Sequence, residues 1–261
     1  MKNIVKPKII YAGDRDISVW VLKFIISQGI LPSALLVSGE KRATHDKGLI
    51  KLCRGLDPSK ILRGNAFRQK KNIDLIKSLK PDYIICVHFP YVVPKEVLDI
   101  PKEGVLNLHP AYLSYNRGWH TPTWAIFDGT PYGATLHFMD EGIDTGDIVH
   151  QKNIKVLPDD TAHKLYSRVK QLEFETFKEA WPSLLAGTYL RLRQFKKDKK
   201  STFHTKKDIS SVQMIDLKKK MKAQKLIDLL RALTTNDIKE AAYYNIDGKK
   251  YRIQINIFQE P

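Results

Sequence analysis

Two polar side chains, Asn107 and His109, stand two positions apart in an otherwise apolar run. If this run is a β-strand, both side chains project from the same face, and Pro110 ends the strand directly after them. Residues 132–139 alternate apolar and polar side chains as a second strand would, and they lead into a loop at 140–147 that is crowded with carboxylates. We therefore expect this loop to bring an aspartate close to the histidine.

These residue types suit acyl transfer to an amine. Histidine exchanges protons near neutral pH, so His109 beside the Asp144 carboxylate could take the proton of an attacking amine. The amide of Asn107 could donate a hydrogen bond to the oxygen that becomes negative in a tetrahedral intermediate. No nucleophile stands out, because Ser114 lies outside any G-x-S-x-G motif and Cys86 lies inside an apolar strand. Direct attack by the substrate is favoured over a covalent enzyme intermediate.

Each motif taken singly also has an ordinary structural explanation. A histidine after a strand is more often structural than catalytic, and a loop rich in Asp and Gly is often only a turn. The order DEGIDTGD at 140–147 does not match the calcium-binding pattern D-x-[DN]-x-[DN]-G, so no metal site is predicted. Cys53 and Cys86 lie in apolar contexts without metal-ligand spacing and are expected to be buried structural thiols.

The elements that position these residues alternate between strands and helices. Strands are expected at 8–12, 34–37, 60–62 and 83–87, with helices at 19–28, 45–52 and 72–79 between them. This order predicts an α/β fold with a doubly wound, mostly parallel sheet. The turn after the first strand, Gly13-Asp14-Arg15-Asp16, lacks the G-x-G-x-x-G pattern, so a nicotinamide or flavin cofactor is not expected.

The strand at 83–87, YIICV, is almost wholly apolar, which is typical of a central parallel strand covered on both faces. An apolar and aromatic loop, residues 88–94, follows it at the edge where open α/β sheets bind ligands. A helix at 121–127, a strand at 148–156 and a long helix that starts after Asp159-Asp160-Thr161 and ends near Ala186 complete this part of the chain.

The remaining sequence is basic and predicts a small second module. The chain carries a formal charge of +16, and residues 191–261 hold 18 Lys or Arg against 8 Asp or Glu. The basic stretch 191–208 is interpreted as a linker or surface segment. A helix at 219–233 and a hairpin at 241–257, turning at Asp247-Gly248, follow it. We expect one domain to about residue 205 and a helix-and-hairpin module at 206–261, whose thin core indicates a dimerisation element.

The charge alone leaves the partner open. Nucleic acid, an anionic small substrate or a lysine-rich proteome would each account for the basic excess, and the last two are favoured over the first. No apolar run approaches the roughly 20 residues that span a bilayer, and the N-terminal segment does not fit a signal peptide. The sequence therefore predicts a cytoplasmic protein.

Four motifs together resemble the 10-formyltetrahydrofolate-dependent formyltransferases. They are Asn107-Leu108-His109-Pro110, the segment 112–119 with Asn116-Arg117-Gly118, the strand GATLH at 133–137 and the loop DEGIDTGDI at 140–148. The chain is most similar to the sugar N-formyltransferase branch, which formylates nucleotide-linked amino sugars for bacterial surface polysaccharides such as the O-antigen of lipopolysaccharide. The resemblance covers most of residues 9–200 and implies the Rossmann-like formyltransferase fold.

The resemblance implies catalytic roles for three residues. His109 would take the proton that leaves the sugar amine, Asn107 would stabilise the oxyanion, and Asp144 would orient His109 and assist proton movement. The formyl donor would be 10-formyltetrahydrofolate, with no metal. Its pocket would be formed by two loops, at His88, Phe89, Tyr91 and Val92 and at Asp140, Gly142 and Ile143. The acceptor would lie against Tyr112, Asn116, Arg117, Trp119 and His120.

The predicted acceptor is a dTDP- or GDP-linked 4-amino-4,6-dideoxyhexose, the predicted assembly is a homodimer, and nucleic acid is not expected as a partner. Methionyl-tRNA formylation is the main alternative. It is disfavoured because those enzymes carry S-L-L-P where this chain has Ala111-Tyr112-Leu113-Ser114, and because the tail is too short for their C-terminal barrel. Glycinamide ribonucleotide formylation would leave the tail without a role. A non-catalytic RNA-binding protein on the same fold would be expected to lack the site residues, yet all three are present.

Overall fold

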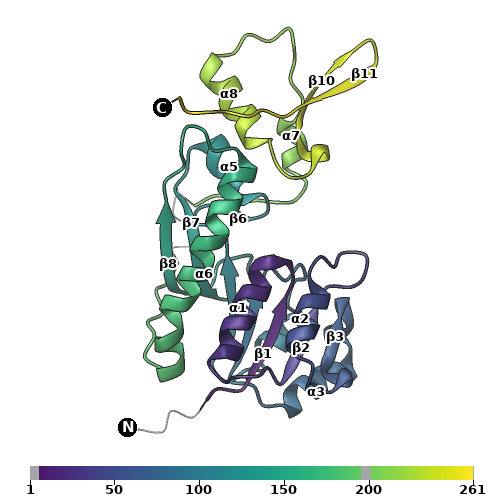
Figure 1. The fold of residues 1–261 in the computed structure, drawn as a ribbon, viewed down its shortest axis with the longest axis vertical. Helices are drawn as coiled ribbons and strands as arrows, with labels where there is room; N and C mark the ends of the chain where they lie inside the picture. The colour runs from purple at the N-terminus through teal and green to yellow at the C-terminus, as the bar shows by residue number, and fades with distance from the viewer. Residues whose placement is uncertain (1–5, 195–200, 261) are drawn as a thin grey trace. The chain divides into compact units, whose positions relative to one another are not determined.

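The computed structural model describes residues 6–194 and 201–260, and the largest sheet within them is mixed and has seven strands (Figure 1). Its strand order is β3-β2-β1-β4-β5-β7-β8. The strands are β1 (Ile9–Gly13), β2 (Ala34–Val37), β3 (Ile61–Arg63), β4 (Tyr83–Val87), β5 (Gly104–His109), β7 (Tyr132–Phe138) and β8 (Ile148–Ile154). Part of the basic segment, residues 195–200, lies outside the described residues.

The first five strands in this order pair in parallel, and β7 pairs antiparallel with β5. The chain moves outward from β1 to β3 and then returns to the other side of β1 at β4, so the winding reverses between β1 and β4. Ligands of open α/β sheets bind beyond the carboxyl ends of the strands at such a reversal. The predicted α/β class with a doubly wound, mostly parallel sheet is confirmed.

Alternate residues of the buried strands face two separate core clusters. Tyr11 and Ile85 belong to a cluster that also contains α1 (Arg15–Ser27), α2 (Asp46–Leu52) and the carboxyl-terminal half of α6 (Ala162–Ala186). Ile10 and Ile84 face the other cluster, which contains η2 (Gly64–Arg68), α3 (Lys70–Ser78) and α4 (Lys95–Leu98). Helices thus cover both faces, which explains why these strands are apolar throughout.

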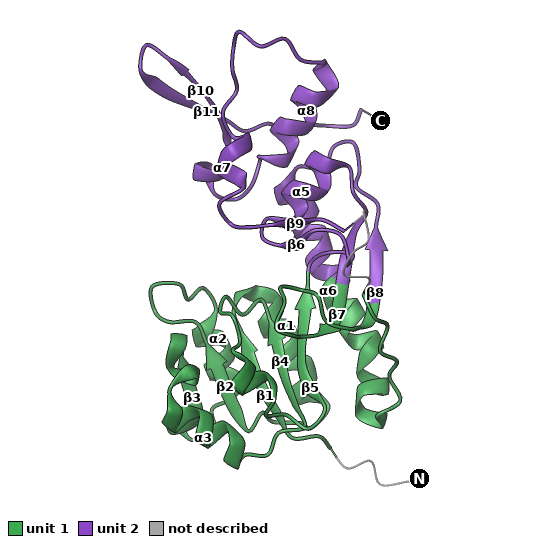
Figure 2. Ribbon diagram, turned by 180° about the vertical axis from the view of Figure 1, so that it is seen from behind, with its two compact units in different colours: residues 1–109, 135–150, 173–194 green, residues 110–134, 151–172, 195–261 purple. Residues whose placement is uncertain are grey.

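The chain divides into two compact units, coloured separately in Figure 2. Unit 1 comprises residues 1–109, 135–150 and 173–194, and unit 2 comprises residues 110–134, 151–172 and 195–261. Strands β7 and β8 and helix α6 contribute residues to both. Unit 1 contains β1 to β5 and η1 (Pro58–Lys60), so it holds most of the sheet.

Unit 2 combines the C-terminal module with segments from the middle of the chain. Its further elements are β6 (Arg117–Gly118), α5 (Thr121–Asp128), β9 (Phe203–His204), α7 (Ile209–Val212), α8 (Ala223–Ala232), η3 (Ile238–Glu240), β10 (Ala242–Ile246) and β11 (Lys249–Ile253). Arg231 of α8 donates hydrogen bonds to the carbonyl oxygens of Asp160, at 2.8 Å, and Leu157, at 2.6 Å. Helix α8 is therefore anchored to the loop that precedes α6, and the domain boundary at residue 205 stays a prediction.

Short elements without a local sequence pattern were not predicted. Strands β6 and β9 have two residues each and pair Arg117 with Phe203 and Gly118 with His204. Helix α8 starts at Ala223, later than the expected residue 219, because Asp216 accepts hydrogen bonds that form a turn there. Among the residues that the structure describes, no helix is both long and apolar enough to span a membrane.

Candidate active site

Strand β5 delivers Asn107 and His109 to the carboxyl edge of the sheet. Leu106 and Leu108, which alternate with them, are buried in the core cluster on the opposite face. The antiparallel register with β7 places Asn107 opposite His137 and His109 opposite Thr135. The alternation of a single strand therefore sets both polar side chains on one face.

The loop after β7 carries Asp144 to both of these side chains. Oδ2 of Asp144 lies 3.6 Å from Nε2 of His109, and Asn107 Nδ2 donates a hydrogen bond to Oδ1 over 3.4 Å. His109 is only 7% exposed, so the carboxylate acts on it in a partly desolvated environment, which strengthens their interaction. The structure thus brings the predicted aspartate to the histidine.

His137 completes this cluster, and no role was predicted for it. Its Nδ1 lies 2.8 Å from the carbonyl oxygen of Phe138, which can only accept, so Nδ1 carries the proton. Nε2 is then the acceptor for the Asn107 amide, 3.2 Å away. Both acceptors near Asn107 require its NH₂ group, which fixes the orientation of the amide. The strand pairing of Asn107 with His137 is the signal that could have identified this residue.

Backbone contacts fix the loop that holds Asp144. Gln194 donates hydrogen bonds to the carbonyl oxygens of Asp144, at 3.1 Å, and Gly146, at 2.7 Å. Asp144 itself adopts a left-handed conformation, with φ of 53°. A Cβ at Gly146 would lie 1.9 Å from the carbonyl oxygen of Phe138, so only glycine allows this approach. Gln194 was not predicted as part of the site.

The two loops predicted for the folate flank these residues within unit 1. Phe89 and Tyr91 pack against the buried ring of Phe67, with ring centroids 5.4 and 6.3 Å away. Val92 and Ile143 leave 71% and 50% of their surface exposed. Exposed apolar side chains beside this polar cluster would suit the flat ring of a pterin.

The other predicted folate contacts have internal partners. His88 is hydrogen-bonded to Glu173, with 2.7 Å between Nε2 and Oε1. Asp140 accepts hydrogen bonds from the backbone of Gly142, at 3.0 Å, and from the hydroxyl of Thr145, so it shapes the loop. The assignment of these residues to folate binding stays a prediction.

The five residues predicted to contact the acceptor all belong to unit 2. Asn116 is buried, and its amide donates to Thr130 Oγ1 at 2.9 Å. Arg117 is also buried, whereas Tyr112 is half-buried and Trp119 is 46% exposed. His120 lies 3.6 Å from the carboxylate of Glu240. Tyr112 and Trp119 therefore offer the accessible surface. Asn116 instead helps to hold the local structure through its hydrogen bond to Thr130.

Burial and hydrogen bonding set the pKa values of three groups near the sheet. Burial would raise the pKa of Asp14, but hydrogen bonds from His45, Thr44, Arg15 and Ser38 outweigh it and lower the pKa, so Asp14 stays ionised. Burial raises the pKa of Cys86 to about 12 and that of Cys53 to about 11. Both thiols are therefore protonated at neutral pH, as expected of structural cysteines.

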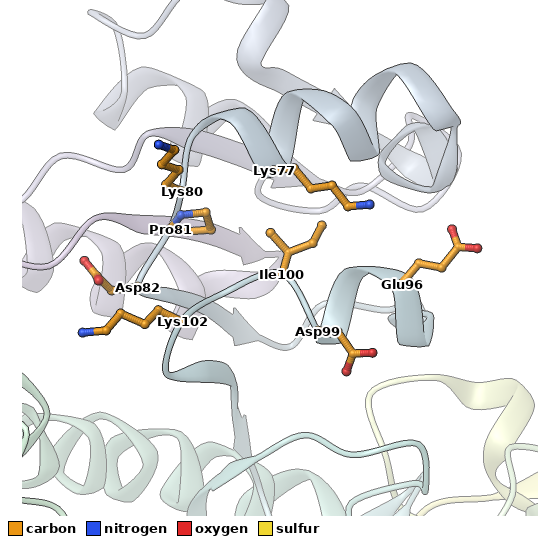
Figure 3. Close-up of a pocket in the computed structure, with 8 residues that line it drawn as sticks. All are labelled: Lys77, Lys80, Pro81, Asp82, Glu96, Asp99, Ile100 and Lys102. Atoms are coloured by element: carbon orange, nitrogen blue, oxygen red, sulfur yellow. The ribbon is translucent and has the colours of Figure 1, made fainter.

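A surface pocket of about 720 Å³ lies away from the cluster (Figure 3). Its lining residues come from segments that precede β4 and β5 or lie in α3 and α4: Lys77, Lys80, Pro81, Asp82, Glu96, Asp99, Ile100 and Lys102. The pocket thus lies at the amino ends of the strands, whereas the cluster of Asn107, His109 and Asp144 lies at the carboxyl ends. In the described part of the chain, no group of three or more His, Cys, Asp or Glu is arranged to hold a metal ion.

Residues 35–181, more than half of the chain, match the formyl transferase family, and residues 208–259 match the N-formyltransferase dimerization C-terminal domain. Among curated relatives, the chain is 31% identical over 192 residues to a methionyl-tRNA formyltransferase of Geobacter sulfurreducens, covering 72% of this chain and 61% of that protein. It is 34% identical to one of Clostridioides difficile, covering 66% of this chain and 57% of that protein. The chain thus spans about 60% of the length of these relatives.

Solved structures with a similar fold match almost the full length. A sugar N-formyltransferase from a Shewanella species has a TM-score of 0.81 at 22% identity and covers 98% of this chain and 99% of its own. A 4-N formyltransferase from Francisella tularensis has a TM-score of 0.82 at 24% identity, with coverage of 97% and 99%. These similarities show that the same fold extends through both units.

Proposed function

Because this chain belongs to the formyl transferase family, we propose that it transfers the formyl group of 10-formyltetrahydrofolate to the amine of a nucleotide-linked amino sugar. Residues 208–259 also match the N-formyltransferase dimerization C-terminal domain. The observation that carries the acceptor class is that a solved sugar N-formyltransferase has the same fold over nearly the whole chain. Within this class, the acceptor that we propose is a 4-amino-4,6-dideoxyhexose linked to dTDP or GDP, used for surface polysaccharide synthesis.

The catalytic cluster can perform each proton transfer that this reaction requires. His109, close to the Asp144 carboxylate, accepts the proton that the amine loses as it attacks the formyl carbon. The Asn107 amide directs its hydrogens to His137 and Asp144, and the contact to Asp144 is long at 3.4 Å. A substrate oxygen that gains negative charge can therefore compete for this donor.

The two loops of unit 1 provide the chemistry that a formyl donor requires. Tetrahydrofolate carries the formyl group on a nitrogen and leaves when that nitrogen regains a proton. The exposed side chains of Val92 and Ile143 can cover its flat rings, and the backbone of loop 88–92 can bind the polar edge of the pterin. In this proposal the two loops bind the donor, and His109 Nε2 passes the proton that it took from the amine to the folate nitrogen as the bond between that nitrogen and the formyl carbon breaks.

Dimerisation is proposed from the same C-terminal match. Exposed apolar side chains in unit 2, including Met214, Leu217 and Ile238, would be buried by a second copy of the chain. Light scattering of the purified full chain is expected to give about twice the mass of 30.0 kDa.

Product analysis tests the acceptor class directly. The protein and 10-formyltetrahydrofolate are incubated separately with dTDP-, GDP- and UDP-linked amino sugars and with methionyl initiator tRNA, and the products are weighed by mass spectrometry. We expect a gain of one formyl group, about 28 Da, on a nucleotide sugar. Formylation of the tRNA alone would overturn the sugar assignment and support the second candidate, which the 31% identity to a methionyl-tRNA formyltransferase favours.

A further inference from the structure

Glu173 of helix α6 is a fully buried carboxylate, with 0% of its surface exposed. Its Oε1 lies 2.7 Å from Nε2 of His88, the first residue after β4. Its Oε2 is also buried and has no hydrogen-bond partner within residues 6–194 and 201–260. A buried contact of this kind between a histidine and a glutamate contributes little net stability compared with apolar side chains of the same size. The contact between His88 and Glu173 is therefore better explained by its effect on the position of the backbone at His88 than by its contribution to stability.

The backbone at His88 is held in a strained conformation. Its φ of 51° is in the left-handed region, which residues other than glycine rarely adopt. The preceding residue, Val87, is fixed by pairing with Gly13 and Leu108, and its carbonyl oxygen accepts a hydrogen bond from the backbone of Asp14. The chain therefore changes direction at His88 itself, at the reversal point of the sheet.

Loop 88–92 is anchored on both faces of the sheet. Phe89 and Tyr91 pack on the cluster that contains α3, and the Tyr91 hydroxyl accepts a hydrogen bond from the backbone of Gly39 at 3.0 Å. Arg68 donates to the Val92 carbonyl oxygen at 2.6 Å. His88 instead contacts α6, which covers the opposite face. The loop is thus fixed on one face by Phe89 and Tyr91 and on the other by the contact of His88 with Glu173. Together these contacts define the path of its backbone.

We propose that His88 and Glu173 act together as positioning residues for the formyl donor. Their contact holds His88 in the left-handed conformation and thereby presents the backbone of residues 89–92 to the pterin. Neither side chain is required to touch the reacting atoms. This inference rests on the proposed function, because it assumes that loop 88–92 binds the donor.

Helix α6 offers a matched control for a substitution at Glu173. Glu179, on the same helix and in the same unit, also pairs with a histidine, with 2.9 Å between its Oε2 and Nε2 of His150. The side chains of His150 and Glu179 are 36% and 49% exposed, so this pair is on the surface. Glu173→Gln and Glu179→Gln therefore make the same chemical change, once at the loop and once away from it.

Binding and kinetics of the full chain then separate positioning from catalysis. For Glu173→Gln we expect the Kd of 5-formyltetrahydrofolate, a donor analogue, to rise about 10-fold in calorimetry, and the KM of the donor to rise in parallel. The kcat at saturating donor and the KM of the acceptor should stay within about 3-fold, because the catalytic cluster is unchanged. Hydrogen exchange of the backbone amides of His88, Phe89, Tyr91 and Val92 should become faster. Glu179→Gln should leave all of these quantities unchanged.

A second variant keeps the test decisive if Glu173→Gln folds poorly. His88→Asn removes the imidazole but tolerates the left-handed conformation, and it should reproduce the loss of donor affinity. The double variant should bind 5-formyltetrahydrofolate no more weakly than either single variant, because the two residues act as one pair. Unchanged donor binding and loop exchange in both single variants would overturn the inference. Wild-type protein that binds no donor would instead overturn the proposed function.

Discussion

At the scale of single residues, the site is a connected set of hydrogen-bonding groups. The carbonyl oxygen of Phe138 fixes the tautomer of His137, His137 orients the Asn107 amide, and Asn107 shares the Asp144 carboxylate with His109. Each group restricts the next, so the donors and acceptors are in place before a substrate binds. Such preorganisation is the main source of electrostatic stabilisation in enzymes.

Replacing the proposed acid-base or oxyanion residue should abolish turnover without unfolding the protein. We expect His109→Asn and Asn107→Ala each to lower kcat at least 100-fold, in line with the loss of a general base or an oxyanion donor. Steady-state formylation assays measure the effect, and circular dichroism checks the fold. A variant that keeps more than about a tenth of the wild-type kcat would contradict these roles.

His137 should influence catalysis through Asn107. His137→Phe keeps a ring but removes the acceptor of the Asn107 amide, so one partly buried N–H loses its partner at a cost of about 1 to 2 kcal/mol. We expect kcat to fall by roughly 5- to 30-fold with little change in either KM. His137→Gln can still accept and should be affected less. Equal losses in both variants would indicate that packing, not orientation of the amide, explains the effect.

At the scale of elements, the loop at 140–147 is a rigid carrier of Asp144. It is held by Gln194, by the contact of Asp140 with Thr145 and by the close approach of Gly146 to β7. A displacement of about 1 Å at a catalytic group can lower the rate about 100-fold. We therefore expect the backbone contacts of the loop to affect activity through the position of its carboxylate.

A methyl group at Gly146 tests this directly. Gly146→Ala would place Cβ 1.9 Å from the Phe138 carbonyl oxygen, so the loop or the strand has to move. We expect kcat to fall about 10- to 100-fold while most of the fold is retained. Gly55→Ala is the control, because no atom lies within 4 Å of the Cβ there. Wild-type kcat in Gly146→Ala would show that the position of the loop does not limit catalysis.

At the scale of the whole molecule, two units share one chain and carry different parts of the proposed function. The three residues proposed to be catalytic and both predicted folate loops belong to unit 1, whereas the predicted acceptor residues and the matched dimerization domain belong to unit 2. Within unit 2, Arg231 and His120 connect the C-terminal elements to segments from the middle of the chain. The stability of unit 2 therefore depends on the C-terminal elements and on the segments from the middle of the chain.

The stability of the molecule should depend on pH through His120. Burial lowers the pKa of His120, although the nearby carboxylate of Glu240 partly opposes this effect. The unfolded chain, with a histidine pKa of about 6.5, then binds the proton more readily than the folded chain, so this group makes the protein less stable as pH falls below about 6.5. Urea unfolding at pH 7.5 and pH 5.5 measures the free energy of unfolding at each pH.

His120→Asn isolates this contribution, because asparagine tolerates the φ of 56° at this position. The variant should lose less stability than the wild type between the two pH values. The same loss in both proteins would show that other groups account for the acid sensitivity.

The sequence alone determined the α/β class, the path of the main strands and the face on which Asn107 and His109 lie. These features follow from the spacing of apolar residues, a pattern that extends over a few neighbouring positions and can therefore be read from the sequence. The motifs around Asn107, His109 and Asp144 also identified the family, because their residue types and spacing are specific in combination.

Only the tertiary structure decided which distant residues complete the site. His137, Gln194 and Glu173 contact the predicted residues through strand pairing and helix packing, which bring together positions that are 30 to 85 residues apart. No local pattern encodes such pairs, since the register of β5 against β7 and the rotation of α6 are set by the packing of the whole core. The residues proposed to do the chemistry could be identified from the sequence. The residues that hold them in place could not.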